Sequence, residues 1–293
     1  MRWSDGGQAP RGAYAGLAAD PRFAAAARTL ARNMLAATAG DEALDGIFKD
    51  AGRYVAAMLG VYLHVSGGLT LPRLKAFCVS SGFVSPGRAR DLLQLQQHLG
   101  FVVMLSPAGG GKPALYAPTD MLMAAWRGHL RAALEAACVV EPAAGRLLTR
   151  LDEPGLFETF ARLHVEGLME SARTLDQGSA YVRVIMHRHA GTQIMWALLT
   201  EGAGEADDFP PRGELPISVS GAARRFGVSR IHIERMLDEA ERENLLRWDR
   251  KGSVVLTDDA RTEIAHTYSG QIVQLLVAAA GTVRERPEPA ARP

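Results

Sequence analysis

Two groups of side chains in this sequence have donors and acceptors of the kind that contact base edges and phosphates. Each group begins with a serine and continues with arginine, histidine or glutamine. The first group is Ser85, Arg88, Arg90, Gln94 and Gln97, and the second is Ser229, Arg230, His232 and Arg235. Arginine can donate two hydrogen bonds to guanine, and glutamine can match adenine. These side chains therefore suit the reading of a double-stranded nucleic acid.

Further cations lie near the two groups. Arg224 and Arg225 come just before the second group, where they suit phosphates that flank a binding site. Other cations lie at the tips of predicted hairpins and suit backbone or minor-groove contacts; these are Lys112, Arg250 and Lys251. Glu234 can accept a hydrogen bond from cytosine or repel phosphate. Because many surface arginines are only solvated, we expect about half of these residues to touch nucleic acid.

The second group lies in an ordered succession of predicted elements over residues 220–258. Ser220 and Ser229 are predicted helix N-caps, since a serine oxygen can accept from unpaired backbone N–H groups. A short helix, a tight turn at Phe226 and Gly227, a helix over 230–243 and a two-stranded hairpin over 245–256 follow from this pattern. Apolar residues line one face of the longer helix and leave the other face free; they are Ile233, Met236, Leu237 and Ala240.

The first group lies in a similar succession over residues 70–120. Thr70 is the predicted cap of a helix that runs to about Ser80, and a capped helix with proline at its start follows and ends at Gly100. Residues 101–105 and 114–117 are predicted strands around a glycine-rich loop. Thr119 and Asp120 then begin a helix that runs to about Cys138.

The two stretches align as an internal repeat. Val84 and Ser85 align with Val228 and Ser229, and Phe101 and Val102 align with Leu245 and Leu246 at the same offset. Thr119 and Asp120 match Thr257 and Asp258 after a shorter second hairpin. The repeat extends outward, because residues 41–65 and 181–200 can each form a leading helix, and residues 121–138 and 259–280 a trailing one. This register predicts a duplication of one structural unit.

The capped turn, the helix that begins after Gly227-Val228-Ser229, the apolar spacing and the hairpin resemble a winged helix-turn-helix, and the order of elements in both halves is similar to that of MarR-like regulators. The resemblance implies a mainly α fold with small β wings. It implies two winged helix-turn-helix units joined by a shared helical centre, so that one chain forms a pseudo-dimer. It also leaves room for a true homodimer and for a small-molecule effector, which no residue here identifies.

We expect five segments. Residues 1–40 form an N-terminal arm, mobile to about residue 21, and a short helix over 22–39; residues 41–140 form the first unit; residues 141–178 form connecting helices; residues 179–281 form the second unit. Residues 282–293 alternate charge and proline and are expected to be disordered. Residues 201–214 are a polar loop within the second unit.

Composition narrows the class of protein. The 293 residues carry a net charge of +1, so nucleic-acid binding requires a local patch of charge. The two cysteines, Cys78 and Cys138, are too few for a disulfide framework. Polar residues interrupt both long uncharged stretches, and the start has no secretory signal, so the sequence predicts a cytoplasmic, nucleoid-associated protein without a membrane segment.

No pattern in the sequence predicts catalysis, a cofactor or a metal. In the glycine-rich loop before Lys112, Pro113 replaces the hydroxyl residue of a phosphate loop, and no helix follows. His187 and His189 diverge on a helix and are expected to be solvated or interfacial. Cys78 has apolar neighbours and is expected to be a small buried residue.

The sequence therefore favours a sequence-specific DNA-binding transcriptional regulator that is not an enzyme. Two alternatives remain open. Tandem winged helices also serve as protein-interaction scaffolds, as in chromosome-partitioning complexes, and as plasmid-type replication initiators. Paired basic helices favour DNA over the scaffold, because a scaffold needs no arginines there. The sequence leaves open whether both wings and both helices contact DNA.

Overall fold

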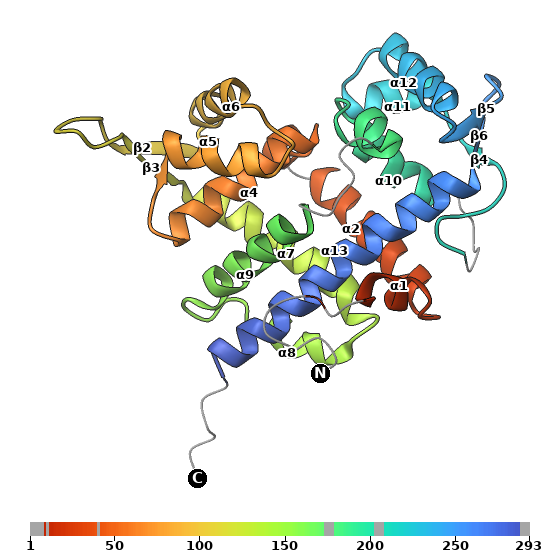
Figure 1. Ribbon diagram of the computed structural model, residues 1–293. Helices are drawn as coiled ribbons and strands as arrows, with labels where there is room; N and C mark the ends of the chain where they lie inside the picture. Colours follow the sequence, from red (N-terminus) through yellow and green to blue (C-terminus); the bar gives the residue numbers. More distant parts are fainter. Residues whose placement is uncertain (1–8, 10–11, 40–41, 173–178, 202–207, 288–293) are drawn as a thin grey trace.

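Helices make up most of the chain, and the strands form two small antiparallel sheets (Figure 1). The structure is a computed structural model that describes residues 9, 12–39, 42–172, 179–201 and 208–287. The mainly α class with small β elements, which the sequence predicted, is confirmed. The two sheets lie far apart, at opposite ends of the molecule.

The first sheet belongs to a segment that we call the first repeat, residues 51–138. Its elements, in chain order, are α4 (Ala51–Val65), β1 (Leu69–Thr70), α5 (Leu71–Ser80), α6 (Pro86–His98), β2 (Val102–Ser106), β3 (Leu115–Pro118) and α7 (Asp120–Cys138). The strand order is β1-β3-β2, so the hairpin strand β3 lies in the middle.

The second repeat, residues 191–285, has the same elements in the same order. They are α10 (Gly191–Glu201), β4 (Leu215–Pro216), α11 (Val219–Phe226), α12 (Arg230–Arg242), β5 (Leu246–Trp248), β6 (Ser253–Leu256) and α13 (Asp258–Glu285). The strand order β4-β6-β5 matches that of the first sheet. Both α6 and α12 contain 13 residues. The predicted internal repeat is thus present at the level of element order and strand order.

Two 17-residue helices outside the repeats tie them together. These are α2 (Phe23–Ala39) and α9 (Leu156–Ala172). Helix α2 packs on α7 of the first repeat and crosses to α10 of the second, whereas α9 packs on α13 of the second repeat and crosses to α4 of the first. Helices α7 and α13 also pack on each other. The repeats therefore share one helical centre, in which α2 and α9 each contact both repeats and α7 contacts α13.

The remaining short elements flank this centre. They are α1 (Ala13–Ala18), α3 (Glu42–Ile47), the 3-10 turn η1 (Pro142–Ala144), α8 (Gly145–Leu148) and the π-helical turn η2 (Val182–Met186). Helix α1 packs on α13, where the Tyr14 and His266 rings meet edge to face at 5.6 Å. Helix α13 crosses the molecule diagonally, and it is largely buried between Ile264 and Thr282.

Hydroxyl caps fix the start of most helices in both repeats. In the first repeat Ser85 accepts from the Arg88 N–H at 3.3 Å, and in the second Ser229 accepts from the His232 N–H at 3.1 Å. Thr119 and Thr257 cap the trailing helices in the same way. The prediction for Ser220 was wrong, because Ser218 is the residue that caps α11. The Ser218 hydroxyl accepts from the Gly221 N–H at 3.1 Å, which places the start of α11 two residues earlier than predicted.

The sequence predictions also differ from the structure at three other places. The expected helix over 41–65 is broken, because Asp50 caps a new helix and accepts from the Arg53 N–H at 2.9 Å. The expected helix over 181–200 is divided into η2 and α10 by residues 187–190. At the two ends of the chain, the arm expected over 1–21 contains α1, and the tail expected to be disordered from residue 282 was predicted too early, because α13 continues to Glu285 with Thr282 buried; residues 1–8 and 288–293 lie outside the described residues.

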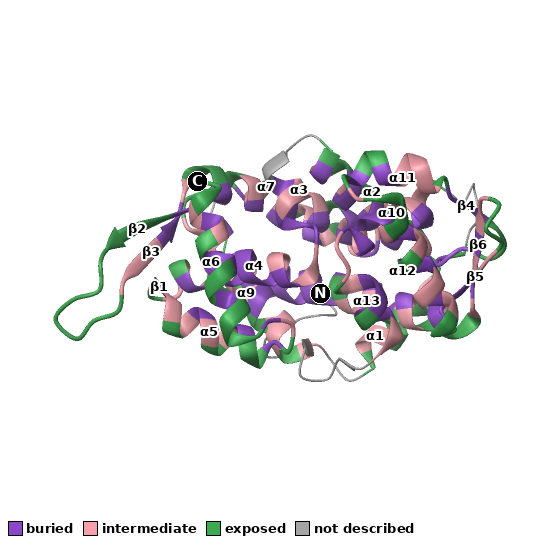
Figure 2. Cartoon of the chain, turned by 90° about the horizontal axis from the view of Figure 1, so that it is seen from above, coloured by how far each residue is buried: buried purple, intermediate pink, exposed green. Residues whose placement is uncertain are grey.

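Burial follows the helical centre (Figure 2). Helices α4 and α13 are extensively buried, whereas the β2–β3 hairpin extends away from the body and β2 is exposed beyond Val102. No helix in the described part of the chain has the length and apolar character needed to cross a membrane.

Candidate nucleic-acid interface

The helices α6 and α12 lie on the same side of the molecule, and the two hairpins point away from each other (Figure 1). Each helix buries one apolar face against its own repeat. The buried residues are Ala89, Leu92, Leu93 and Gln96 in α6, and Ile233, Met236, Leu237 and Ala240 in α12. The helix that precedes each of them ends in a turn with a positive-φ glycine, Gly82 or Gly227. In both repeats, therefore, a glycine turn precedes a helix that buries one face and exposes the other to solvent.

The exposed face of α6 carries most of the predicted side chains of the first group. Arg88, Arg90 and Gln94 are exposed, and Gln97 is half-buried. The Arg88 guanidinium is 3.8 Å from the Asp50 carboxylate, with half of its side chain exposed, and such a pair contributes at most about 1 kcal/mol. Within the described residues, Arg90 has no hydrogen-bond or ion-pair partner. Both arginines are therefore available to an external anion.

The exposed face of α12 is narrower. Arg230 and Arg235 are exposed, but His232 is half-buried and its Nε2 donates to the His189 carbonyl at 2.8 Å. Glu234 is half-buried. The structure thus separates the second predicted group into two solvent-facing arginines and a histidine that points into the protein.

Residues 183–190, which precede the second repeat, contact α12. Arg188 pairs with Glu239, and Arg183 pairs with Glu243 at 2.7 Å. His187 stacks near Phe83, which lies in the turn before α6, at 5.4 Å between ring centroids. Partial burial lowers the pKa of both His187 and His189 below its ordinary value. Residues 183–190 therefore contact α12 and the turn that precedes α6.

The hairpins differ in where their cations point. In the second hairpin Arg250 bonds to Asp238 at 2.7 Å and to Glu241 at 3.1 Å, and it stacks over the Trp248 ring at 4.7 Å. Asp249 accepts three backbone N–H bonds in the same turn, which lowers its pKa to about 2. Lys112 and Lys251, by contrast, are exposed. Arg250 fastens its hairpin to α12, whereas the lysines are presented to solvent.

The cations before α12 are also divided. Arg224 is exposed on α11, while the adjacent Arg225 pairs with Glu201 at 2.7 Å and stacks over Phe226 at 5.2 Å. The structure therefore brings a subset of the predicted residues to solvent without strong internal partners; this subset is Arg88, Arg90, Gln94, Lys112, Arg224, Arg230, Arg235 and Lys251. The hydroxyls of Ser85 and Ser229 face their own helix ends as caps.

The sequence analysis missed the residues that couple the repeats. Lys49, between α3 and α4, is 9% exposed, and its Nζ donates to the carbonyl of Phe226 at 2.8 Å and pairs with Asp45 at 2.7 Å. A single lysine in an apolar stretch was the only available signal, and nothing local indicates its partner on α11. The cysteines are free, and Cys78 is buried as expected.

Comparisons with known protein families, with curated protein sequences and with solved structures give no match in any of the three. A search of the described residues for three or more His, Cys, Asp or Glu side chains placed to hold a metal ion also finds none. The case for a function therefore depends on the geometry of this chain alone.

Proposed function

We propose that the two repeats are winged helix-turn-helix units and that the chain is a sequence-specific regulator of transcription that binds double-stranded DNA as its own pseudo-dimer. One observation carries the proposal. The repeats have the same order of elements and the same strand order. The equivalent helices α6 and α12 lie on the same side of the molecule, and each has arginines on its exposed face.

The chemistry of these faces suits DNA. Helices of this size fit the major groove, and two of them on one side can enter successive turns of a duplex. Arg88 and Arg90 on α6, and Arg230 and Arg235 on α12, have guanidinium groups that can pair with guanine or with phosphate. Lys112 and Lys251 at the hairpins suit phosphates on the flanks.

The two faces are chemically unequal, and this predicts the kind of site. Helix α6 offers two arginines and two glutamines, whereas α12 offers two arginines beside Glu234. A palindromic DNA site is bound by two identical recognition helices, and α6 and α12 differ. The proposed DNA site therefore has two different half-sites about one helical turn apart. Selection of bound duplexes from a random pool tests this, and recovery of a symmetric motif would contradict the pseudo-dimer.

Paired substitutions test the faces directly. Arg88→Ala with Arg90→Ala, and Arg230→Ala with Arg235→Ala, should each weaken binding to the selected duplex at least about 30-fold, because each arginine contributes about 1–3 kcal/mol. The matched control is Arg146→Ala with Arg286→Ala, which removes the same charge at the ends of α8 and α13, away from both faces. Thermal melting of each variant checks that the fold is intact.

Salt dependence separates DNA binding from the scaffold alternative. Phosphate contacts release counterions, so DNA affinity should fall steeply as salt rises. One observation favours a scaffold: the edge strand β2 exposes Val103, Met104 and Leu105. If affinity for duplex DNA is weak and flat in salt, and neither double variant alters it, the scaffold replaces the regulator. Genome-wide mapping separates a regulator, which occupies promoters, from a replication initiator, which occupies repeated sites at an origin.

A further inference from the structure

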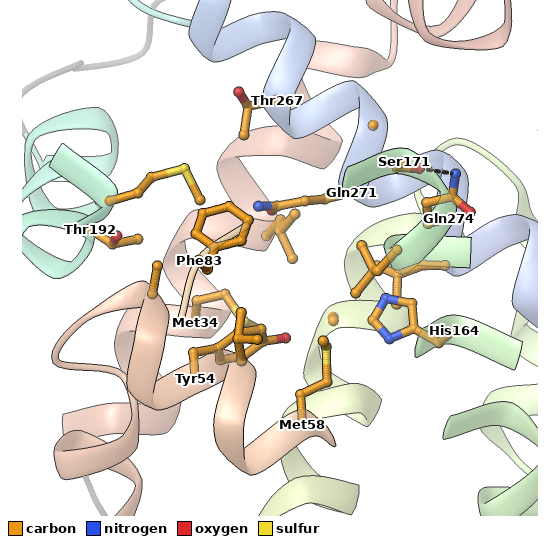
Figure 3. A pocket seen from close by; sticks show the side chains of 18 of the residues that line it. Met34, Tyr54, Met58, Phe83, His164, Ser171, Thr192, Thr267, Gln271 and Gln274 are labelled. Carbon is orange, nitrogen blue, oxygen red and sulfur yellow. Dashed lines mark hydrogen bonds between the residues drawn. The ribbon is translucent and has the colours of Figure 1, made fainter. Parts of the chain in front are cut away.

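Apolar side chains are left open both inside the molecule and on its surface. Inside, Met34, Met58 and Phe83 project into a cavity of about 240 Å³ in the helical centre (Figure 3). Sites for drug-sized molecules begin at about 300 Å³, so no strand or helix of another chain fits there. On the surface, the first hairpin, β2–β3, extends away from the body. The hairpin is therefore an apolar surface that a protein partner can reach.

Five large apolar residues lie together at the base and along the outer strand of this hairpin. Each is between 44% and 60% exposed; they are Leu99, Val103, Met104, Leu105 and Met121. A Cβ atom at Gly100 would lie 3.8 Å from the Met121 methyl group, which places Met121 beside Leu99 and the start of β2. Residues 99–111 include no charged side chain. A contiguous apolar patch of this kind marks an interaction surface.

The second repeat has charged residues at most of the equivalent positions. Counted from the helix caps and along the paired strands, the equivalents of Leu99, Val103, Leu105 and Met121 are charged and exposed; these are Glu243, Arg247, Asp249 and Asp259. Because both repeats have the same order of elements, this architecture does not require apolar residues at these positions. The patch is therefore a specific feature of the first repeat.

The fifth position shows how the outer edge of the second sheet is closed. Trp248 pairs with β6 in the same register in which Met104 pairs with β3. The Trp248 N–H donates to the Glu241 carboxylate at 3.0 Å, and the Trp248 carbonyl accepts from Arg250 at 3.2 Å. Both backbone groups of Trp248 therefore point away from β6, and side chains of the same chain occupy them.

The outer edge of β2 is open at the equivalent place. Because the register is the same, the N–H and the carbonyl of Met104 also point away from the neighbouring strand. Gln97 and Ser106 stand at the positions equivalent to Glu241 and Arg250, and no side chain in the described part of the chain bonds to the Met104 backbone. Unpaired N–H and C=O groups on a strand edge are a template for a further strand.

We propose that two copies of this chain pair through β2, in an antiparallel arrangement with its twofold axis at Met104. The N–H of Met104 in each copy donates to the carbonyl of Met104 in the other, and the two three-stranded sheets join into one continuous sheet. The apolar patch of one copy covers that of the other, and neither brings a charge that would lose its hydration.

The remaining strand edges favour this closed pair. An open chain of molecules would need a second free edge, but β5 is occupied by side chains, and β1 and β4 contain two residues each. A foreign strand would need an equally uncharged apolar face, which a second copy has by symmetry. The contact buries about 1,000 Å² in total, which is small for a specific interface, so we expect a Kd of about 1–100 μM.

Sedimentation equilibrium of the full chain without DNA, at concentrations from well below to well above this Kd, tests the pairing. Monomer and dimer should be the two species. Because the patch is uncharged, the Kd should stay within about twofold between low and high salt, unlike DNA affinity. A chain that is monomeric at every concentration, or that forms assemblies larger than a dimer, would overturn the proposal.

A charge at Met104 tests the position of the axis. Met104→Lys and Met104→Glu each place two like charges opposite one another, so either variant alone should associate at least about tenfold more weakly. An equimolar mixture of the two variants should form a one-to-one heterodimer, because the facing charges are then opposite. The control is Ile231→Lys, the same change at a 58% exposed residue of α12, which should dimerise as the natural chain does. Thermal melting of each variant checks the fold.

Three results would contradict the β2 pair. Dimerisation of Met104→Lys with the natural Kd would place the contact elsewhere. A mixture that stays monomeric would show that Met104 does not face Met104 of the second copy, and a loss of dimer in Ile231→Lys would place α12 in the contact. DNA is absent from every sample, so failure of the β2 pair and failure of the proposed DNA binding are distinguished.

Discussion

The two repeats share an architecture but differ in how their outer helix is held. Helix α12 is fixed by Arg188, Arg183 and Arg250, which pair with its acids, and by the bond from His232 to the neighbouring loop. Helix α6 has one long contact of this kind, from Arg88 to Asp50, and its hairpin projects freely into solvent. Acidic residues that seem unfavourable for DNA on α12 therefore act as internal partners that position the helix.

This difference suggests separate tasks for the two faces. The cations of α6 remain available to an external anion, so the first repeat contributes more of the electrostatic affinity in the proposed complex. Near α12, Arg225 and Arg250 have internal partners, whereas the other cations are exposed; these are Arg224, Arg230, Arg235, Arg242, Arg247 and Lys251. A helix that is already held in place loses less conformational freedom on binding, so the contacts that α12 makes in the proposed complex are formed at a lower entropic cost.

The largest expected effect concerns whether the repeats fold as one unit. Leu93 of α6 and Leu237 of α12 occupy equivalent positions and are 2% and 1% exposed. Leu93→Ala and Leu237→Ala should each lower the free energy of unfolding by about 2–5 kcal/mol through lost burial and a residual cavity. Because α2 and α9 cross between the repeats, both variants should unfold in a single transition in urea. Two separate transitions would show that the repeats are independent, and Leu99→Ala, at an exposed end of α6, is the control.

The next effect concerns a tie that only the second repeat receives. Helix α11 ends at the buried Lys49, which lies between α3 and α4, whereas at the corresponding end of α5 the Ser81 hydroxyl donates to the carbonyl of Cys78 at 2.7 Å. Lys49→Met leaves the Phe226 carbonyl and Asp45 without this partner and should cost about 1–3 kcal/mol in unfolding free energy. Lys75→Met, the same change on α5, should cost under about 0.5 kcal/mol. Equal losses in the two variants would show that this tie contributes nothing.

Acid should weaken the shared centre through its buried histidines. Histidine has an ordinary pKa of 6.5, and burial lowers the pKa of His129 to about 3 and that of His164 to about 4. Below pH 6.5 the unfolded chain takes up protons at these positions and the folded chain does not, so stability falls as the pH drops toward 4 and is constant in this respect above pH 6.5. The loss is at most about 1.4 kcal/mol per pH unit for each histidine.

Urea unfolding at pH 7.5 and pH 5.5 measures this dependence. His164→Phe should reduce the loss between the two values, whereas His98→Phe, at an exposed position on α6, should leave it unaltered. An equal acid response in the natural chain and in His164→Phe would show that the buried imidazole does not set it. Because the histidines lie between the repeats, both repeats should lose stability together.

Local chemistry explains which parts of this comparison the sequence predicts. The N-caps Ser85, Ser229, Thr119 and Thr257 and the apolar spacing of α6 and α12 depend on residues a few positions apart, and the structure has them as expected. The two-residue strands β1 and β4 were missed, because only their pairing with β3 and β6 defines them. A broad apolar stripe on both sides of Asp50 likewise concealed the break that this residue makes before α4.

The candidate site divides in the same way. The exposed positions of Arg88, Arg90, Arg230 and Arg235 follow from helical periodicity. The internal partners of Arg225 and His232 lie far from them in the sequence or on another element, so composition alone gave them as free. The contacts that α2 and α9 make with both repeats join segments far apart in the sequence, a scale at which periodicity in one segment carries no information.

The smallest expected effect distinguishes Arg250, whose guanidinium has partners within the protein, from Lys112, which is exposed to solvent. Arg250 is 55% exposed, so its pairs with Asp238 and Glu241 and its stacking on Trp248 together contribute under about 1 kcal/mol to global stability. Arg250→Ala should still speed backbone hydrogen exchange in residues 246–256, because these contacts hold the hairpin to α12. Lys112→Ala should leave exchange in the first hairpin unaltered. In DNA binding the two variants should behave in the opposite way. Lys112→Ala should reduce the magnitude of the slope of log affinity against log salt by about one, and Arg250→Ala should leave this slope unaltered. If Arg250→Ala lowers the slope as much as Lys112→Ala does, Arg250 leaves its internal partners for phosphate, and the second hairpin is as free as the first.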